Sequence, residues 1–300
     1  MYYLVFGCLY LLSLLPWRII YLLSDFAFLI TYYLIRYRRK VVAENLLFAF
    51  PDKTDAERRQ IAIKFYRRFC DTWLETIKLL TVSKDSLLKR VSGDTTIFEN
   101  LYAEGRSVQA NLGHFINWEI FNISMGIIQP YQFLGVYFPQ SNKTADRLMK
   151  YIRGRWGNVL IPSTDIARSI IPWRKKQYYI GLGGDQSAPP SSSYWLNFMN
   201  RPAPFVKGPE KFARGQQLPV VMATITQPRR GYYRFDFFLT ADHTESLPEG
   251  ELMRRYVRNM EKNIRLQPEL YLWSHRRWKH AWQPAYAAQW VDDQPMPASR

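Results

Sequence analysis

The sequence predicts an α/β fold in which a mixed, largely parallel sheet is flanked by helices and preceded by a hydrophobic segment. Patterns typical of strands and helices alternate beyond residue 106, as in parallel sheets. The chain has 300 residues, of which 47% are hydrophobic, enough for a sizeable core. Its first 35 residues carry only two charges. We therefore expect a membrane anchor with a basic flank over residues 1–40 and a folded domain over 41–300, helical over 41–100 and α/β over 101–285.

The expected anchor is divided by Pro16 and Arg18 into an uncharged stretch and a second apolar stretch, which contains one acid and ends at Ile35. A membrane span needs about 20 apolar residues. A single tilted span and a membrane-embedded helical hairpin both fit, and a buried hairpin of a soluble protein is the remaining alternative. The segment lacks the basic leader and small-residue cleavage site of a secretory signal, which favours its retention. Four basic residues follow and favour a cytoplasmic location for the rest of the chain: Arg36, Arg38, Arg39 and Lys40.

The later elements follow from hydrophobic spacing and capping signals. A capping box from Thr54 to Glu57 and apolar residues at helical spacing, including Trp73, predict a long amphipathic helix as far as Ile77. Apolar or alternating runs predict strands at 107–112, 131–138, 158–161, 177–182, 218–226 and 232–239. Helical patterns lie between several of them, at 118–128, 143–153 and 165–173. The proline-rich segment 186–209 is expected to be a long loop.

The charge balance narrows the classes of partner. A formal charge of +16 predicts an acidic partner, such as nucleic acid, an anionic membrane, an acidic protein or a phosphorylated substrate. The apolar content excludes a disordered polycation. Cys8 and Cys70 are too few for a disulfide framework and lack zinc-ligand spacing, so we expect free thiols. The mean hydropathy of −0.28 excludes a polytopic membrane protein.

A candidate catalytic base follows the predicted strand 107–112. His114 comes directly after the strand and Gly113, and Glu119 lies five residues further on. Positions five apart on a helix are about 140° apart, so these side chains meet only if His114 precedes a helix that contains Glu119 in its first turns. A carboxylate on one imidazole nitrogen would let the other take a proton from a hydroxyl. Because the sequence has no serine-elbow, zinc-protease, Walker or dinucleotide motif, it predicts direct attack by a substrate hydroxyl. The alternative is a histidine whose bonds are satisfied in the core.

The string from Gly113 to Glu119 (GHFINWE) resembles the signature of the lipid A late acyltransferases, the lauroyl/myristoyl transferase family of bacterial inner membranes. Residues 39–51, the Gly184-Asp185-Gln186 triplet and residues 268–279 are similar to further motifs of that family, in the same order. The resemblance implies a glycerolphosphate-acyltransferase-like fold in the cell inner membrane, with its catalytic domain on the cytoplasmic face. It implies transfer of a fatty acyl chain from acyl carrier protein, or from acyl-CoA, to a hydroxyl of a lipid A precursor, without a metal or cofactor.

The resemblance also assigns roles to residues. It implies that His114 and Glu119 form the catalytic dyad, and that Asp185 and Arg153, or alternatively Arg155, are further active-site residues. Thioester attack develops an oxyanion, which an arginine can stabilise. Arg153 fits a phosphate or surface contact equally well, and Asp185 fits a role in the local scaffold. Substrate contacts are expected from five residues: Asn117, Arg155, Gln186, Arg276 and Arg277. The basic C-terminal motif suits lipid phosphates or a structural clamp.

The sequence departs from the family pattern after Gln186. An aromatic pair followed by glycine, and then a glycine turn with threonine, are usual there. Here the chain has Phe198-Met199-Asn200 and then Val206 to Pro209. Because this region is expected to shape the substrate pocket, an aminolipid (an ornithine or glycine lipid) or a glycophospholipid is an alternative acceptor. A non-enzymatic alternative is a membrane-anchored basic module that binds lipid or nucleic acid, although the motifs argue against nucleic acid as a partner.

Overall fold

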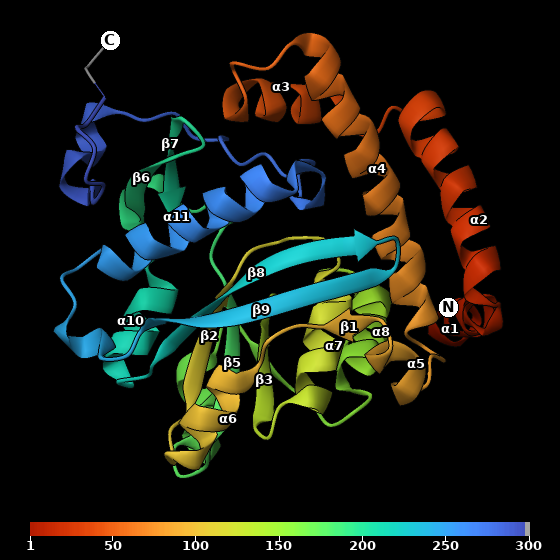
Figure 1. Cartoon of the computed structure of the whole chain (residues 1–300), viewed down its shortest axis with the longest axis horizontal. Helices are drawn as coiled ribbons and strands as arrows, with labels where there is room; N and C mark the ends of the chain where they lie inside the picture. The colour runs from red at the N-terminus through yellow and green to blue at the C-terminus, as the bar shows by residue number, and fades with distance from the viewer. Residues whose placement is uncertain (298–300) are drawn as a thin grey trace.

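A seven-stranded sheet forms the centre of the structure, a computed structural model that describes residues 1–297 (Figure 1). The strand order is β1-β9-β8-β2-β5-β3-β4, and each neighbouring pair is parallel except β8 with β9. The α/β class with a largely parallel sheet is therefore confirmed. The strands are β1 (Val91–Ser92), β2 (Val108–Leu112), β3 (Gln132–Tyr137), β4 (Val159–Pro162), β5 (Tyr178–Gly183), β8 (Val220–Arg229) and β9 (Tyr232–Ala241).

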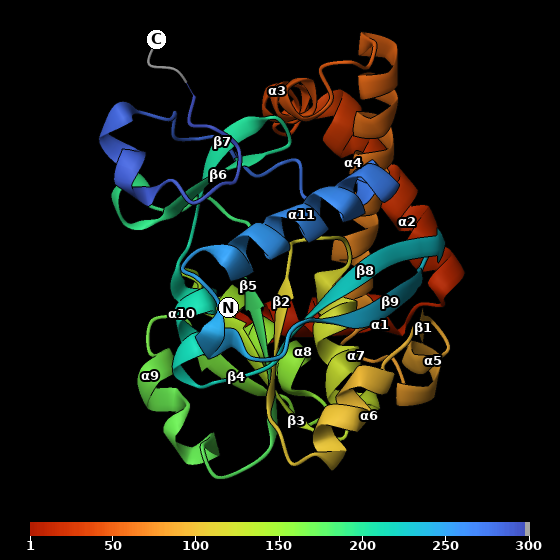
Figure 2. The ribbon, with the colours of Figure 1, turned by 60° about the vertical axis from the view of Figure 1, so that its left-hand side comes forward.

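The helices flank the sheet and extend beyond one of its ends (Figures 1 and 2). Their bounds are α1 (Tyr2–Leu14), α2 (Trp17–Leu29), α3 (Arg39–Ala49), α4 (Asp55–Lys78), α5 (Lys84–Leu88), α6 (Thr96–Ala103), α7 (Trp118–Ile128), α8 (Lys143–Gly154), α9 (Ile166–Ser169), α10 (Gly208–Gly215) and α11 (Glu251–Leu266). The capping box before α4 is formed, with both of its hydrogen bonds present. The predicted helix 165–173 is instead divided into α9 and a 3₁₀ turn, Ile171–Trp173, which contains Pro172. Proline has no N–H to continue the α-helical bonding.

The segment 186–209 contains a β-hairpin, so the prediction of a long loop is wrong. Strands β6 (Tyr194–Phe198) and β7 (Arg201–Phe205) pair antiparallel. The turn between them has positive φ angles at both central residues, 48° at Met199 and 68° at Asn200, which is the requirement of a tight type I′ hairpin turn. Pro202 and Pro204 are tolerated because β7 is an edge strand of a two-stranded sheet. The prolines suggested a loop, and Met-Asn is a weak turn signal.

Helix α2 packs along α4, and α1 lies at the end of α4 and contacts α8, so neither projects from the domain (Figures 1 and 2). Phe28 and Tyr32 belong to the same hydrophobic core as Phe65 and Tyr66 of α4. A π-helical turn, Ile30–Leu34, continues α2, and the combined helix Trp17–Leu34 is long and apolar enough to cross a membrane by length and composition alone. The division into an anchor and a folded domain stays a prediction. The apolar length of the combined helix fits an anchor, but both helices also pack onto the folded domain.

Candidate active site

The central feature of the site is a pair formed by His114 and Asp185. His114 lies two residues beyond the end of β2, and Asp185 lies two residues beyond the end of β5. The strands are parallel neighbours in which Leu112 pairs with Gly183, so their carboxyl ends deliver the two side chains to one place. Asp185 Oδ1 lies 2.6 Å from His114 Nδ1, and Oδ2 accepts the backbone N–H of His114 at 3.0 Å.

This pairing corrects the expectation that Glu119 orients the His114 ring. Glu119 lies in the first turn of α7, and its carboxylate accepts two bonds from Arg153 at the end of α8: Nε to Oε2 at 2.8 Å and Nη2 to Oε1 at 2.5 Å. The Trp118 indole also donates to Glu119 Oε1 at 2.9 Å and packs edge-on against the imidazole, with ring centroids 5.9 Å apart. The structure thus brings together His114, Glu119, Arg153 and Asp185, but in two pairs.

Asn117 holds the start of α7. Its Oδ1 accepts the N–H groups of Glu119 at 2.9 Å and Ile120 at 3.2 Å, as an N-cap residue does. Its Nδ2 donates to Oε2 of Glu75, a fully buried carboxylate on α4, at 2.9 Å. Asn117 was expected to contact substrate, and the structure adds a positioning role. Local spacing gave no signal for Glu75, because Asp71, Thr72 and Lys78, which lie one turn away, are also polar.

The C-terminal part of the chain fastens both loops of the site. Tyr256 of α11 donates to the carbonyl of Leu112 at 2.7 Å and accepts the N–H of Gly184 at 3.3 Å, which joins the ends of β2 and β5. The N–H of Leu272 donates to the carbonyl of His114 at 3.2 Å. His275 Nε2 accepts the N–H of Ser187 at 2.9 Å, just after Asp185. Tyr256 could not be predicted from the sequence, since a tyrosine on a helix carries no signal of such a contact.

The His114 ring opens into a cavity of about 240 Å³. Polar residues in its wall include Asn117, Arg153 and Gln186, and its apolar wall includes Phe121 and Phe235. The His114 ring packs closely against the backbone of Gly183. A side chain at this position would crowd the ring, because a Cβ on Gly183 would lie only 3.2 Å from His114 Cε1. Among the described residues, no protein partner bonds His114 Nε2, so this nitrogen is available to a ligand in the cavity.

Three other arginines of the sequence analysis lie outside this cavity. Arg155 donates to the backbone carbonyls of Leu79 and Val82, so Arg153 is the arginine at the site. Arg277 is 1% exposed and donates to the carbonyl of Pro204 at 2.8 Å. Arg276 lies in a basic groove beside α3 and α4. In this structure none of the three is placed to touch a ligand bound at His114.

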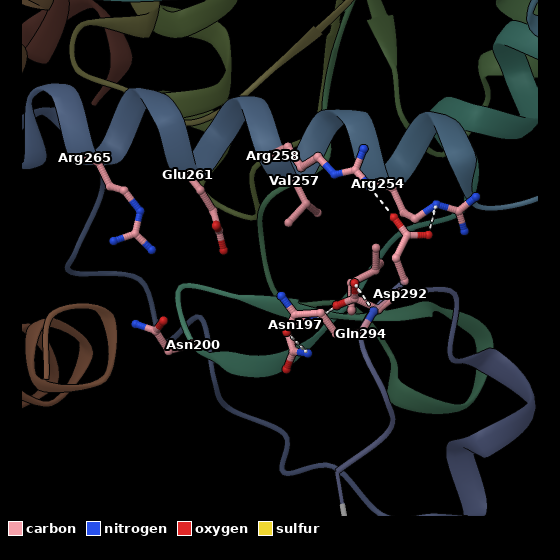
Figure 3. A pocket seen from close by; sticks show the side chains of 11 residues that line it. Asn197, Asn200, Arg254, Val257, Arg258, Glu261, Arg265, Asp292 and Gln294 are labelled. Carbon is pink, nitrogen blue, oxygen red and sulfur yellow. Dashed lines mark hydrogen bonds and ion pairs between the residues drawn. The ribbon is translucent and has the colours of Figure 1, made fainter.

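A second polar cavity, of about 260 Å³, lies between α11 and the β6–β7 hairpin (Figure 3). Figure 3 shows Glu261 and Arg265 of α11 pointing across it toward the hairpin. Several of its charged groups bind or belong to the C-terminal segment: Arg254 Nε lies 3.2 Å from Asp293, and Asp292 accepts the N–H of Asn197 at 2.6 Å. We therefore assign it to packing of the C-terminal segment.

The electrostatics of the first cavity favour a proton on the His114 ring. Burial lowers the pKa of His114, but the charge and hydrogen bond of Asp185, together with the charge of Glu119, outweigh it and raise the pKa above its ordinary value. Burial raises the pKa of Asp185, yet His114 lowers it overall. By contrast, burial lowers the pKa of His275 to about 4, which keeps this ring neutral and able to accept a hydrogen bond.

The arrangement has the features that general-base catalysis requires: an imidazole held by a buried carboxylate, with its second nitrogen facing a cavity. Within residues 1–297, no three His, Cys, Asp or Glu side chains are grouped so as to hold a metal ion. An imidazole paired with a carboxylate in this way can take the proton of a hydroxyl group and so activate it for attack on an acyl carbon.

Comparison with known proteins identifies the family. A family model described as bacterial lipid A biosynthesis acyltransferase matches residues 1–280. The lipid A biosynthesis lauroyltransferase of Escherichia coli strain K12 is 26% identical over 280 residues, which cover 91% of this chain and 89% of the relative. The lipid A biosynthesis palmitoleoyltransferase of the same strain is 25% identical over 252 residues, covering 82% and 80%. The chain therefore belongs to the bacterial lipid A biosynthesis acyltransferase family, and it is an acyltransferase.

Proposed function

We propose that this protein transfers a fatty acyl chain from acyl carrier protein to a hydroxyl of a lipid A precursor at the cytoplasmic face of the inner membrane, with His114 as general base. The family match supports acyl transfer to a lipid A precursor. The observation that carries the mechanism is the 2.6 Å contact between His114 Nδ1 and Asp185 beside an open cavity. The charge of +16 suits both an acidic carrier protein and a phosphorylated acceptor.

In the proposed reaction, His114 Nε2 takes the proton of the acceptor hydroxyl as its oxygen attacks the thioester carbonyl carbon. Asp185 stabilises the imidazolium through Nδ1. The tetrahedral oxyanion then collapses, the carbon–sulfur bond breaks, and the thiolate leaves and receives the proton from the imidazolium. Arg153 lines the cavity, and its Nη1 has no hydrogen-bond partner among the described residues. This nitrogen is therefore suited to stabilise the oxyanion. Glu119 holds that guanidinium in place.

The direct test is an assay of the purified protein in detergent micelles with acyl carrier protein thioesters and a hydroxylated lipid A precursor. We expect acyl transfer to the precursor without added metal, and slower transfer from acyl-CoA. Supplying ornithine lipid in place of the precursor tests the alternative acceptor. Transfer to ornithine lipid and none to the precursor would contradict the proposal.

The pH dependence of this activity follows from the raised pKa of His114. A base acts only when it is deprotonated, so kcat/KM should rise with pH through a value above about 6.5, the ordinary histidine pKa. The Asp185→Asn variant loses the negative charge that favours imidazolium, so its acidic limb should move to lower pH. Rate profiles of both proteins between pH 5 and 9, about two units either side of neutral, measure this shift. An acidic limb at the same pH in both proteins would contradict the assignment.

An apolar cavity of about 600 Å³ beside the catalytic cavity is suited to the acyl chain. It lies between α9 and α10, and the two cavities share Val136, Leu182 and Gly183 in their walls. Its size is in the usual range for ligand pockets, about 300–1,000 Å³. Arg174 and Lys211 also line it and can meet the phosphorylated group of a carrier protein.

Opposite changes in this cavity should shift the preferred chain length in opposite directions. A Cβ at Gly208 meets no atom within 4 Å, so Gly208→Leu narrows the cavity without a clash at Cβ, whereas Ile166→Ala widens it. Each added or lost methylene in an apolar pocket changes kcat/KM about 10- to 200-fold. We expect Gly208→Leu to favour shorter chains and Ile166→Ala longer ones in competition assays with mixed donors. Gly7→Leu is the control, because a Cβ at Gly7 also meets no atom within 4 Å. If both cavity variants kept the native preference for acyl-chain length, the acyl chain would not bind in this cavity.

A further inference from the structure

We infer that α1 and α2 lie flat in one leaflet of the membrane as an in-plane anchor, rather than crossing the bilayer. The inference rests on the membrane location in the proposed function and goes beyond it by specifying the depth and orientation of the two helices. The sequence leaves open a single span and a membrane-embedded hairpin, and the in-plane anchor replaces both.

The inner face of α2 is bonded to the domain along its length. Tyr21 donates to Glu75 at 2.8 Å, and Ser24 donates to Asp71 at 2.7 Å. Asp25 accepts a bond from Arg230 at 3.0 Å. Three apolar side chains on the same face are almost fully buried: Ile20, Phe28 and Tyr32. Thus α2 is held against α4 and against the hairpin of β8 and β9.

The turn between the two helices is fastened as well. Lys78 donates to the backbone carbonyls of Ser13 at 2.7 Å and Leu15 at 2.8 Å. Thr81 donates to the carbonyl of Ser13 at 2.7 Å. These bonds satisfy carbonyl groups at the end of α1, which have no partner within a helix. The turn therefore lies against the domain at the end of α4. In a transmembrane hairpin, this turn would instead lie on the far side of the bilayer, away from the domain.

The outer side of both helices is largely apolar and exposed, and on α2 it also carries the charges of Arg18 and Asp25. On α2, Leu22, Phe26 and Leu29 are 64%, 61% and 51% exposed, and they recur at helical spacing. On α1, Leu4 and Leu11 are 72% and 67% exposed. Exposed apolar side chains grouped in this way mark an interaction site, and lipid fits them, because the two charges on the same side of α2, Arg18 and Asp25, can stay at the headgroup level of an in-plane helix.

The charges bonded to α2 oppose a span. If Trp17–Leu34 crossed the bilayer in this structure, Asp25, Asp71 and Arg230 would enter the hydrocarbon with α4. Ionised side chains are strongly disfavoured at the bilayer centre. Detaching α2 instead would remove the bond from Ser24 to the buried Asp71 and the bond from Tyr21 to the buried Glu75. An in-plane helix keeps every bond and immerses only its outer face, about 5–10 Å deep.

A basic groove of about 1200 Å³ at the end of α2 gives the anchor a matching polar border. Four exposed arginines and lysines line it without protein partners among the described residues: Arg36, Lys40, Arg59 and Arg276. Positive charge directly beside an immersed apolar face attracts anionic headgroups. The groove therefore fits a membrane whose surface lies along α1 and α2.

Thiol labelling from the side of the membrane opposite to the catalytic domain separates the topologies. Cys8 is exposed and Cys70 is buried, so the native protein offers one reactive thiol in α1. A membrane-impermeant maleimide on that side should label neither Cys8 nor a Leu14→Cys, Cys8→Ser variant at the turn. A single span would expose both thiols, and a transmembrane hairpin would expose the thiol at residue 14. Either labelling result would overturn the inference.

Depth measurements supply a second, independent readout. Bimane is attached in a Cys8→Ser background to Leu22→Cys, Phe26→Cys or Leu29→Cys, and its quenching by shallow and deep spin-labelled lipids is compared in vesicles with 30 mol% anionic lipid, roughly the charge density that recruits basic segments. We expect equal, shallow depths at the three positions, and no quenching for the Lys175→Cys control. In a span, residues 22 and 29 would differ in depth by about 10 Å, from a rise of 1.5 Å per residue, and that result would contradict the inference. Acyl transfer by the same variants in micelles is measured separately, so a failure of the proposed activity remains distinguishable.

Discussion

Replacing His114 by glutamine is expected to lower kcat for acyl transfer by about 10²- to 10⁴-fold, the usual contribution of a general base. The glutamine amide can still donate to Asp185, which is 2% exposed, so the buried carboxylate keeps a partner and the fold should be retained. Asp185→Asn should lower kcat by a similar factor, because the imidazolium loses its counter-charge. Steady-state kinetics and thermal melts of the three proteins measure both effects.

The matched control is His243→Gln, since the side chain of His243 is 73% exposed and lies outside the site. It should leave kcat unchanged. If Asp185→Asn retained full activity while Glu119→Gln lost it, Glu119 would be the partner of His114 in catalysis, as the sequence alone suggested. Activity above a tenth of the native rate in His114→Gln would exclude His114 as the base.

The largest loss of stability is expected at the pair of Glu119 and Arg153. Their side chains are 4% and 17% exposed, and two hydrogen bonds join them. Arg153→Met would leave Glu119 charged and buried, which typically costs about 3–5 kcal/mol. For a chain of this size, that corresponds to a fall in Tm of roughly 6–20 °C, at about 2–4 °C per kcal/mol. Thermal unfolding monitored by circular dichroism measures it.

A double-mutant cycle tests whether the loss comes from the unpaired charge. Glu119→Gln combined with Arg153→Met should recover part of the stability lost in Arg153→Met alone, because no buried charge is then left unpaired. Arg258→Met is the matched control, since Arg258 pairs with Asp293 at the surface, where such pairs contribute about 0–1 kcal/mol. Equal destabilisation by Arg153→Met and Arg258→Met would contradict a buried pair.

Local patterns were sufficient for the elements around the site. The strand before His114 and the helix from Trp118 to Ile128 were both predicted within a residue or so, because alternation, capping and helical spacing are properties of neighbouring residues. The long helix α4 was predicted from its capping box, but its buried face was not. Trp73, expected on the apolar stripe, is 49% exposed, whereas Glu75 is buried. A step of four residues drifts around a helix with 3.6 residues per turn, which shifts the predicted face.

Local patterns were enough to predict the class of fold, the position of His114 at a strand end and Glu119 as a candidate, and the family resemblance added Asp185 and one of the two arginines Arg153 and Arg155. The sequence by itself did not determine which carboxylate binds the imidazole. His114 and Asp185 are 71 positions apart, and they meet only because β2 and β5 are adjacent in the sheet and paired in register. Strand order depends on contacts between distant segments, which local spacing does not encode. For the same reason, only the tertiary structure showed that the inner face of α2 is bonded to α4 and to the turn between β8 and β9, while apolar side chains on its outer side stay exposed.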